Sequence, residues 1–131
     1  MPRYFTLEEV IALLPSLRPL LHEAQGLSRR MLALQHDVKQ MAPPSVGNGH
    51  SQHAGDALEK GRQLEQMNRR LQLILATAKD LGCEVKDIDS GLVDFLAQRE
   101  GKEVYLCWRM DEDTLGWWHD LDTGFQGRQP L

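Results

Sequence analysis

The chain has 131 residues, of which 41% are hydrophobic and 26% are charged, and its formal net charge at pH 7 is −4. This length suits a single domain over residues 1–131. No apolar run approaches the ~20 residues of a membrane span, which excludes a membrane-embedded protein. The two cysteines, Cys83 and Cys107, form no CxxC pair, and the N-terminus lacks the apolar core of a signal peptide. We therefore expect a cytoplasmic protein with reduced cysteines.

Charge is distributed unevenly along the chain. Residues 1–82 hold ten Lys and Arg against eight Asp and Glu, a balance of +2, whereas residues 83–131 hold five against eleven, a balance of −6. An acidic segment repels the phosphate backbone of nucleic acids. The basic residues of the first part are scattered, whereas nucleic-acid binding requires a clustered stripe. We therefore expect no nucleic-acid partner.

The first expected element is a helix over residues 7–14. Thr6 and Glu9 have the spacing of a capping box at its start. Pro15 suits the first turn of a new helix better than the interior of this one, and Pro19 is expected to kink that new helix. The next apolar residues alternate between spacings of three and four and are Ala24, Leu27, Met31, Leu34, Val38 and Met41. This heptad pattern predicts a helix that presents an apolar seam to another helix.

Residues 42–53 are expected to form a flexible loop, since two Pro, two Gly and small polar residues neither continue a helix nor bury apolar surface. A second apolar seam with the same alternation follows at Leu64, Met67, Leu71, Ile74, Ala78 and Leu81. Gly82 is then a natural helix cap. Residues 1–82 are thus predicted to form a long antiparallel helical hairpin. Two helices alone cover such seams incompletely, which favours a homodimer.

From residue 83 the hydrophobic pattern alternates with the period of two that is typical of strands. Strands are expected at residues 84–88, 92–95, 103–109 and 115–119, joined by turns short enough for antiparallel hairpins. The tail, residues 123–130, contains two Gly and is expected to be irregular. The predicted fold class is therefore α+β, a long antiparallel helical hairpin followed by a small antiparallel β-sheet head over residues 83–131.

Several blocks of sequence resemble one known family. They are FTLEE at residues 5–9, ALLPSLRPLL at 12–21, GLVDF at 91–95, GKEVYLCWR at 101–109, WWHDLDTGF at 117–125 and GRQP at 127–130. In this order they resemble the bacterial family known as domain of unknown function 2203, over most of the chain except the loop. The resemblance implies no activity, because none is established for that family. Function must therefore be inferred from the residues.

His119 and three carboxylates are candidate metal ligands. Asp120 follows His119 directly, and Asp89 and Asp94 lie in neighbouring segments. One imidazole with two or three carboxylates suits a divalent metal such as Zn²⁺, Mn²⁺ or Fe²⁺. His119 is more simply a structural residue hydrogen-bonded inside the head, because no HExxH or comparable motif is present. Asp89 is more simply a turn residue that caps its own backbone.

Asp94 and Arg128 are the most informative charged residues of the head. Asp94 lies between Val93 and Phe95, so strand alternation places it on the opposite face from both, either exposed to solvent or in a site. Arg128 is isolated among acidic neighbours. Its planar guanidinium can clamp a carboxylate of the head, with Asp94 and Asp120 as the best candidates, or bind a carboxylate or phosphate of a ligand.

Trp108 and Trp118 are candidates for stacking against a ligand ring. Trp117 and Trp118 are neighbours on one strand and cannot both face the core, so one is expected to be exposed or covered by a partner. Trp108 and Cys107 are more simply core residues. A nucleophilic cysteine needs a base and an electropositive setting, which this acidic segment does not offer.

Two hypotheses about function arise from these patterns. The first is a non-enzymatic interaction or ligand-binding module that self-associates through its hairpin, with a head that contacts a protein or small molecule. The ligand-binding candidates are Asp94, Trp108, Trp118, His119 and Arg128. The second is a metal-dependent enzyme whose site contains His119, Asp94 and either Asp89 or Asp120. Metal analysis of protein purified without a His-tag distinguishes them.

Overall fold

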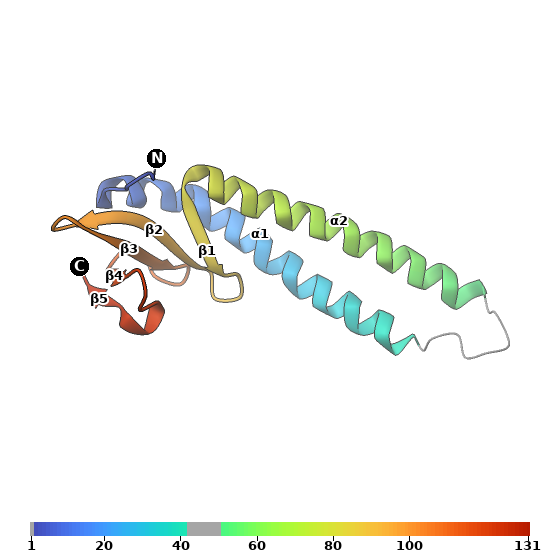
Figure 1. Cartoon of the computed structure of the whole chain (residues 1–131). Coiled ribbons are helices and arrows are strands. Elements are labelled where there is room, and N and C mark those ends of the chain that lie inside the picture. The colour runs from blue at the N-terminus through green and yellow to red at the C-terminus, as the bar shows by residue number, and fades with distance from the viewer. Residues whose placement is uncertain (1, 42–50) are drawn as a thin grey trace.

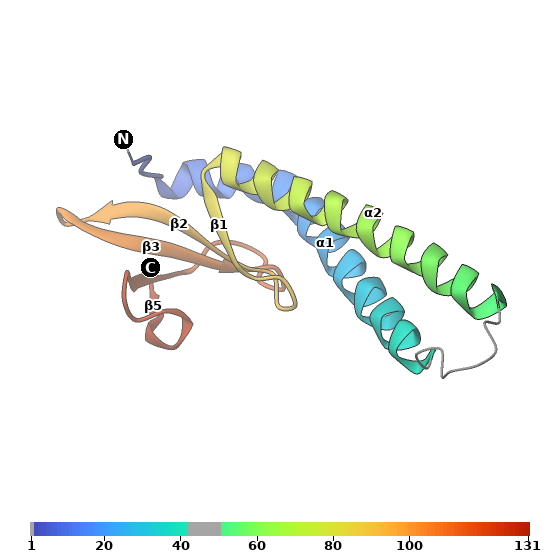
Figure 2. The ribbon, with the colours of Figure 1, turned by 45° about the vertical axis from the view of Figure 1, so that its right-hand side comes forward.

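Two long helices lie side by side, and a small twisted sheet is attached at one end of the pair (Figures 1 and 2). The computed structural model describes residues 2–41 and 51–131. The elements in chain order are α1 (Leu7–Gln40), α2 (Ser51–Leu81), β1 (Cys83–Asp87), β2 (Leu92–Arg99), β3 (Lys102–Arg109), β4 (Trp117–Asp120), the 3₁₀ helix η1 (Phe125–Gly127) and β5 (Gln129–Pro130). The predicted α+β class, a helical hairpin followed by an antiparallel sheet, is confirmed. Among the described residues, no helix is both long and apolar enough to cross a membrane.

Helix α1 begins at the predicted capping box. The Glu9 amide donates to the Thr6 hydroxyl at 3.1 Å, and the Thr6 amide donates to the Glu9 carboxylate at 2.9 Å. The predicted end at residue 14 is wrong, because α1 continues through Pro15 and Pro19 to Gln40. Both prolines lie on the exposed side of the helix. The carbonyls that lose their helical donors there face solvent, where water can replace the missing bonds.

The apolar seams of α1 and α2 face each other, and their burial decreases along the hairpin. Near the head, Ala24 and Leu27 form a buried cluster with Leu71 and Ile74. Residues 28–40 of α1 and 55–70 of α2 include none that is buried. We call these two segments the outer half of the hairpin, and residues 7–27 and 71–81 the inner half.

The predicted loop over residues 42–53 is too long at its C-terminal end. Helix α2 already begins at Ser51, so residues 51–53 are helical. The sequence from Ser51 to Leu81 contains no Pro, and nothing therefore stops the helix from extending back over these polar positions. The rest of the predicted loop, residues 42–50, lies outside the described residues.

All the described strands are antiparallel, and their order in the sheet follows the chain, β1-β2-β3-β4-β5. The two-residue turn Glu100-Gly101 joins β2 to β3, and both of its residues have positive φ, 54° and 78°. This is the type I′ geometry that suits tight hairpins. The tail, predicted to be irregular, instead forms η1 and then β5, which pairs with β4. Gly127 permits this path, because a Cβ there would lie 2.4 Å from the Thr123 Cβ.

The two faces of the sheet differ in chemistry. The face toward the helices packs on the inner half of α1 and carries Val93, Phe95, Ala97, Val104, Leu106 and Trp108. The opposite face carries Asp94, Cys107 and His119. Figure 1 shows η1 and β5 on the side of the sheet away from the helices. Asp94, on this second face, is buried rather than exposed to solvent.

Candidate metal centre

Side chains from four strands form a row on the face of the sheet away from the helices. Glu84, Asp94, Cys107 and Trp117 are successive cross-strand neighbours, and His119 lies opposite Tyr105 in the adjacent row. Directly opposed side chains in antiparallel strands have Cβ atoms only about 4.5–5.5 Å apart. The register of the sheet therefore gathers a carboxylate, a thiol and an imidazole from three different strands.

The candidate site is a buried cluster of three neighbouring side chains, those of Asp94, Cys107 and His119. Their exposed fractions are 3%, 0% and 2%, and their metal-ligating atoms all lie within 4.8 Å of one another. His119 Nε2 is 3.1 Å from each oxygen of the Asp94 carboxylate. Burial and the charge of Asp94 raise the pKa of the Cys107 thiol to about 12. The thiol is therefore protonated at neutral pH in the absence of a cation, which excludes a free nucleophilic thiolate.

The backbone determines which nitrogen of His119 carries hydrogen. Nδ1 lies 2.7 Å from the carbonyl oxygen of Asp120. A carbonyl oxygen can only accept, so Nδ1 must carry the proton, and a neutral imidazole then has only a lone pair at Nε2. That lone pair faces the two oxygens of Asp94, which are also acceptors. The pair is stable only with a cation between the two groups, either an additional proton or a metal ion.

Tyr105 forms one side of this cluster. Its ring centroid lies 5.6 Å from that of His119. Burial and a hydrogen bond to the Glu84 carboxylate raise the pKa of Tyr105 to about 12. The same hydrogen bond holds the pKa of Glu84 below its ordinary value. Tyr105 is therefore protonated at neutral pH, and its ring packs against the imidazole.

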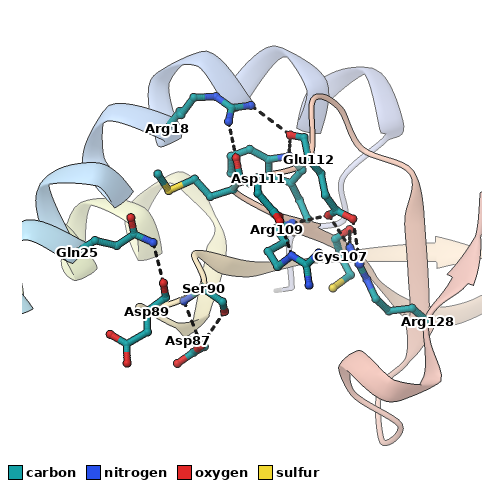
Figure 3. A network of polar contacts seen from close by, with 12 residues as sticks. Arg18, Gln25, Asp87, Asp89, Ser90, Cys107, Arg109, Asp111, Glu112 and Arg128 are labelled. Atoms are coloured by element: carbon teal, nitrogen blue, oxygen red, sulfur yellow. Dashed lines mark hydrogen bonds and ion pairs between the residues drawn. The ribbon is translucent and has the colours of Figure 1, made fainter.

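The other two predicted metal ligands lie outside the cluster. The Asp120 carboxylate pairs with Lys102 Nζ at 3.0 Å, and only its backbone carbonyl contacts His119. Asp89 is exposed in the turn between β1 and β2, where its carbonyl accepts from Gln25 of α1. The carboxylate that caps this turn belongs to Asp87, which accepts from the Ser90 amide and hydroxyl (Figure 3). The prediction that Asp89 caps the turn is therefore wrong.

Arg128 clamps a carboxylate of the head, as one alternative predicted, but the predicted partners Asp94 and Asp120 are wrong. Its Nη1 and Nη2 donate to the two oxygens of Glu112 at 3.0 and 2.6 Å (Figure 3). Nη2 also donates to the Cys107 carbonyl at 3.1 Å. The Arg128 and Glu112 side chains are 9% and 17% exposed. Asp94 is instead committed to His119.

Glu112 connects three parts of the head. Its carboxylate accepts from the Arg109 amide at 2.7 Å in addition to Arg128. Its backbone carbonyl accepts from Trp108 Nε1 at 3.1 Å and from Arg18 Nη2 of α1 at 3.3 Å. The connection between β3 and β4 is thereby tied to the tail, to the core and to the helix.

The tryptophans are distributed as the strand alternation predicted. Trp108 is completely buried in the core beside Arg18, as expected. Trp117 is 36% exposed, and the Arg128 guanidinium lies 5.2 Å from its ring centroid. Trp118 is half-buried, with the guanidinium of Arg99 4.8 Å from its ring centroid. Trp117 and Trp118 thus already stack with arginines of the chain itself.

A separate surface depression of about 600 Å³ lies between α1 and the turns of the head. It is lined by His22, Gln25, Asp89, Ser90, Arg109, Met110 and Asp111. None of these residues belongs to the Asp94–Cys107–His119 cluster. The depression is wide open to solvent, whereas the cluster gathers three buried groups that could together hold a metal ion, so we place the candidate site at the cluster.

Sequence analysis missed two residues of this region. Cys107 belongs to the buried cluster, and Glu112 is the partner of Arg128. The position of Cys107 beside Asp94 could have been predicted from the turn that joins β2 to β3. Counting outward from the two-residue turn Glu100-Gly101 pairs Arg99 with Lys102 and, five steps further, Asp94 with Cys107. For Glu112 no comparable signal exists, because it lies in an irregular connection and its pairing with the tail is purely tertiary.

Comparison with known proteins gives a family but no function. No curated protein and no solved structure matches the chain. A family model described as "Uncharacterized conserved protein (DUF2203)" matches residues 3–131, which include both helices and the whole head. The resemblance noted from the sequence blocks is thus confirmed, and the chain belongs to the uncharacterised conserved family DUF2203.

Proposed function

We propose that this protein is a metal-binding module whose head holds a divalent transition metal between Asp94, Cys107 and His119. The observation that carries the proposal is the 2.7 Å contact between His119 Nδ1 and the Asp120 carbonyl, which leaves the Nε2 lone pair toward the Asp94 carboxylate. Histidines that ligate metals are commonly held in this way, with the second ring nitrogen donating to a carbonyl or carboxylate.

The separations within the cluster support the proposal. Zinc binds N and O ligands at about 2.0–2.2 Å and S at about 2.3 Å, so neighbouring ligand atoms of a tetrahedral site lie roughly 3.3–3.6 Å apart. The separation of 3.1 Å between His119 Nε2 and the Asp94 oxygens is close to this value. Cys107 Sγ lies within 4.8 Å of both groups. A shift of about 1 Å, within reach of side-chain rotation, would complete three ligands of a tetrahedral site.

Charge and ligand type indicate which cation fits. A divalent ion with the Asp94 carboxylate, the Cys107 thiolate and neutral His119 sums to zero, so a loaded site places no net charge in the interior. Mixed N, O and S ligands favour Zn²⁺, Co²⁺ or Fe²⁺ over Mg²⁺ and Ca²⁺, which take oxygen ligands. Of the ions considered from the sequence, Mn²⁺ fits least well, because it prefers oxygen to thiolate.

Burial of the ligands favours a metal-holding role over a catalytic one. Catalytic zinc sites keep a coordination position accessible to substrate. Here each of the three ligand residues is at most 3% exposed. We therefore place a non-enzymatic binding module ahead of a metal-dependent enzyme.

The proposal is tested by metal titration of protein purified without a His-tag and stripped with a chelator. We expect one equivalent of Zn²⁺ or Co²⁺ to bind, with the intense visible absorption of tetrahedral Co²⁺. Asp94→Asn, Cys107→Ser and His119→Gln should each weaken binding by at least about tenfold, because each removes a ligand. Matched controls are Cys83→Ser, which alters the other buried thiol, and His22→Gln, which alters an exposed imidazole. Wild-type protein that binds neither ion would refute the proposal and leave a buried Asp94–His119 ion pair.

The hairpin favours a second function, self-association. Among its described residues the outer half has none that is buried, and Leu32 and Leu58 are 61% and 60% exposed. Two copies packed as a four-helix bundle would cover this apolar surface. Sedimentation of the wild type should show a dimer, and Leu32→Gln with Leu58→Gln should yield a monomer. Leu73→Gln, at a 55% exposed leucine of the inner half, is the control. A monomeric wild type at high micromolar concentration would exclude this function.

A further inference from the structure

Arg128 contains a buried donor that its own clamp does not use. Its Nη1 and Nη2 atoms are paired with Glu112 and with the Cys107 carbonyl. Its Nε atom is buried and has no acceptor among the residues that the structure describes. Buried donors are nearly always paired, and leaving one unpaired is unfavourable, so this atom requires an explanation.

The Cys107 sulfur is an acceptor of the right kind. The side chains of Cys107 and Arg128 lie next to each other (Figure 3). A protonated thiol is a weak acceptor, whereas a thiolate accepts strongly from a charged donor. The buried Nε–H, on a guanidinium already bonded to the Cys107 carbonyl, is therefore a donor suited to a metal-bound sulfur beside it.

We propose that Arg128 is a positioning residue of the metal centre, and that its Nε–H donates to the Cys107 sulfur when the sulfur binds the cation as a thiolate. The inference rests on the proposed metal site. It restricts the metal ions expected at the site to thiophilic divalent ions such as Zn²⁺, Co²⁺ and Cd²⁺. Donors around a ligating atom orient it and tune its affinity for metal.

The rest of the Arg128 environment is suited to this role. Its guanidinium lies 5.2 Å from the ring centroid of Trp117 and 4.7 Å from that of Phe125. Together with the two bonds to Glu112, these rings hold the plane of the guanidinium and the direction of Nε–H. A lysine would keep the positive charge but lacks the rigid planar fork that pairs with both Glu112 oxygens while Nε–H points in a fixed direction.

The inference is tested by Co²⁺ titration of chelator-treated wild type, Arg128→Lys and Glu112→Gln. Glu112→Gln is the matched control, because it weakens the same clamp but keeps the Nε–H. We expect Arg128→Lys to reduce Co²⁺ affinity by about 10- to 100-fold and to shift the thiolate-to-Co²⁺ charge-transfer band. Glu112→Gln should reduce affinity by a much smaller factor and retain the band position. Equal losses of Co²⁺ affinity in the two variants would overturn the inference. They would mean that Arg128 acts on the site only by pairing with Glu112 and holding the tail.

A double-mutant cycle identifies the sulfur as the group through which Arg128 acts. In a Cys107→Ser background, Arg128→Lys should cause no further loss of Co²⁺ affinity. The same loss with and without Cys107 would contradict the inference while leaving the metal site intact. If the wild type itself binds no Co²⁺, the metal site fails and the inference fails with it. If Arg128→Lys does not fold, Arg128→Gln replaces it in both experiments, because it also lacks the charged Nε–H.

Discussion

Two regions of the molecule are stabilised in different ways. The first is the head together with the inner half of the hairpin, and the second is the outer half of the hairpin. In the first region Leu17, Phe95 and Trp108 are completely enclosed. In the second, none of residues 28–40 and 55–70 is buried. Hydrophobic stabilisation scales with the apolar area removed from water. The first region therefore has a buried core of its own. The outer half has none, and its stability depends on its connection to that core and on any partner that covers it.

Polar interactions show the same division. In the head, the Arg128–Glu112 pair is at most 17% exposed. On the hairpin, Arg70 pairs with Glu23 and Arg69 with Glu65, and all four side chains are at least 39% exposed. Exposed ion pairs contribute little to stability, whereas breaking a buried one leaves an uncompensated charge. The outer half therefore lacks both sources of strong stabilisation.

The largest expected effect comes from shortening one leucine in each region. Leu17→Ala, in the core, should lower the free energy of unfolding by about 3–5 kcal/mol, because it leaves a cavity in a closed environment. Leu34→Ala, at a half-buried position of the outer half, should cost only about 1 kcal/mol. Urea denaturation of chelator-treated protein measures both values. Equal losses at the two positions would mean that the outer half is as well buried as the core, for example inside a dimer.

The second effect compares two arginines that each pair with a glutamate. Arg128→Ala should cost about 3 kcal/mol, because it strands the largely buried Glu112 carboxylate. Arg70→Ala should cost much less, because water replaces its exposed contact with Glu23. Both are measured by urea denaturation without metal, since a bound ion would add its own stabilisation. An Arg128→Ala protein as stable as the wild type would show that the clamp does not hold the tail.

Features with strong local signals were predictable from the sequence. The capping box of Thr6 and Glu9 depends only on residues three apart, and the turn at Glu100-Gly101 depends on a glycine that adopts positive φ without strain. The continuation of α1 through Pro15 was not predictable in this way. It depends on which side of the helix faces solvent, and that side is determined by the sheet packed against the other one.

The candidate site was predictable only in part. His119 and Asp94 stood out because a histidine and an alternating carboxylate are unusual in a short strand. Asp89 and Asp120 were included because they are close in sequence to Asp94 and His119. Asp120 directly follows His119 on β4 and so points to the other face of the sheet, and Asp89 is exposed in the turn between β1 and β2. The pairing of Arg128 with Glu112 joins the tail to an irregular connection, and no local pattern encodes such a contact.

The smallest expected effect concerns the pH dependence of the Glu23–Arg70 pair, which links the two helices at the boundary between the inner and outer halves. The hydrogen bond from Arg70 lowers the pKa of Glu23 in the folded protein. A group with a lowered folded-state pKa stabilises the fold above its unfolded pKa, about 4.3 for Glu, and loses this contribution as the pH falls through the folded value. Wild type should therefore be slightly more stable than Glu23→Gln at pH 7, and the difference should shrink as the pH falls below about 4.3 and through the lower folded-state pKa of Glu23. Urea denaturation of both proteins across this range measures it, with Glu65→Gln as the control for an ion pair within one helix. If the difference in unfolding free energy between wild type and Glu23→Gln persisted unchanged at low pH, Glu23 would act through packing rather than through its charge. The boundary between the two halves of the hairpin would then be held by apolar contacts.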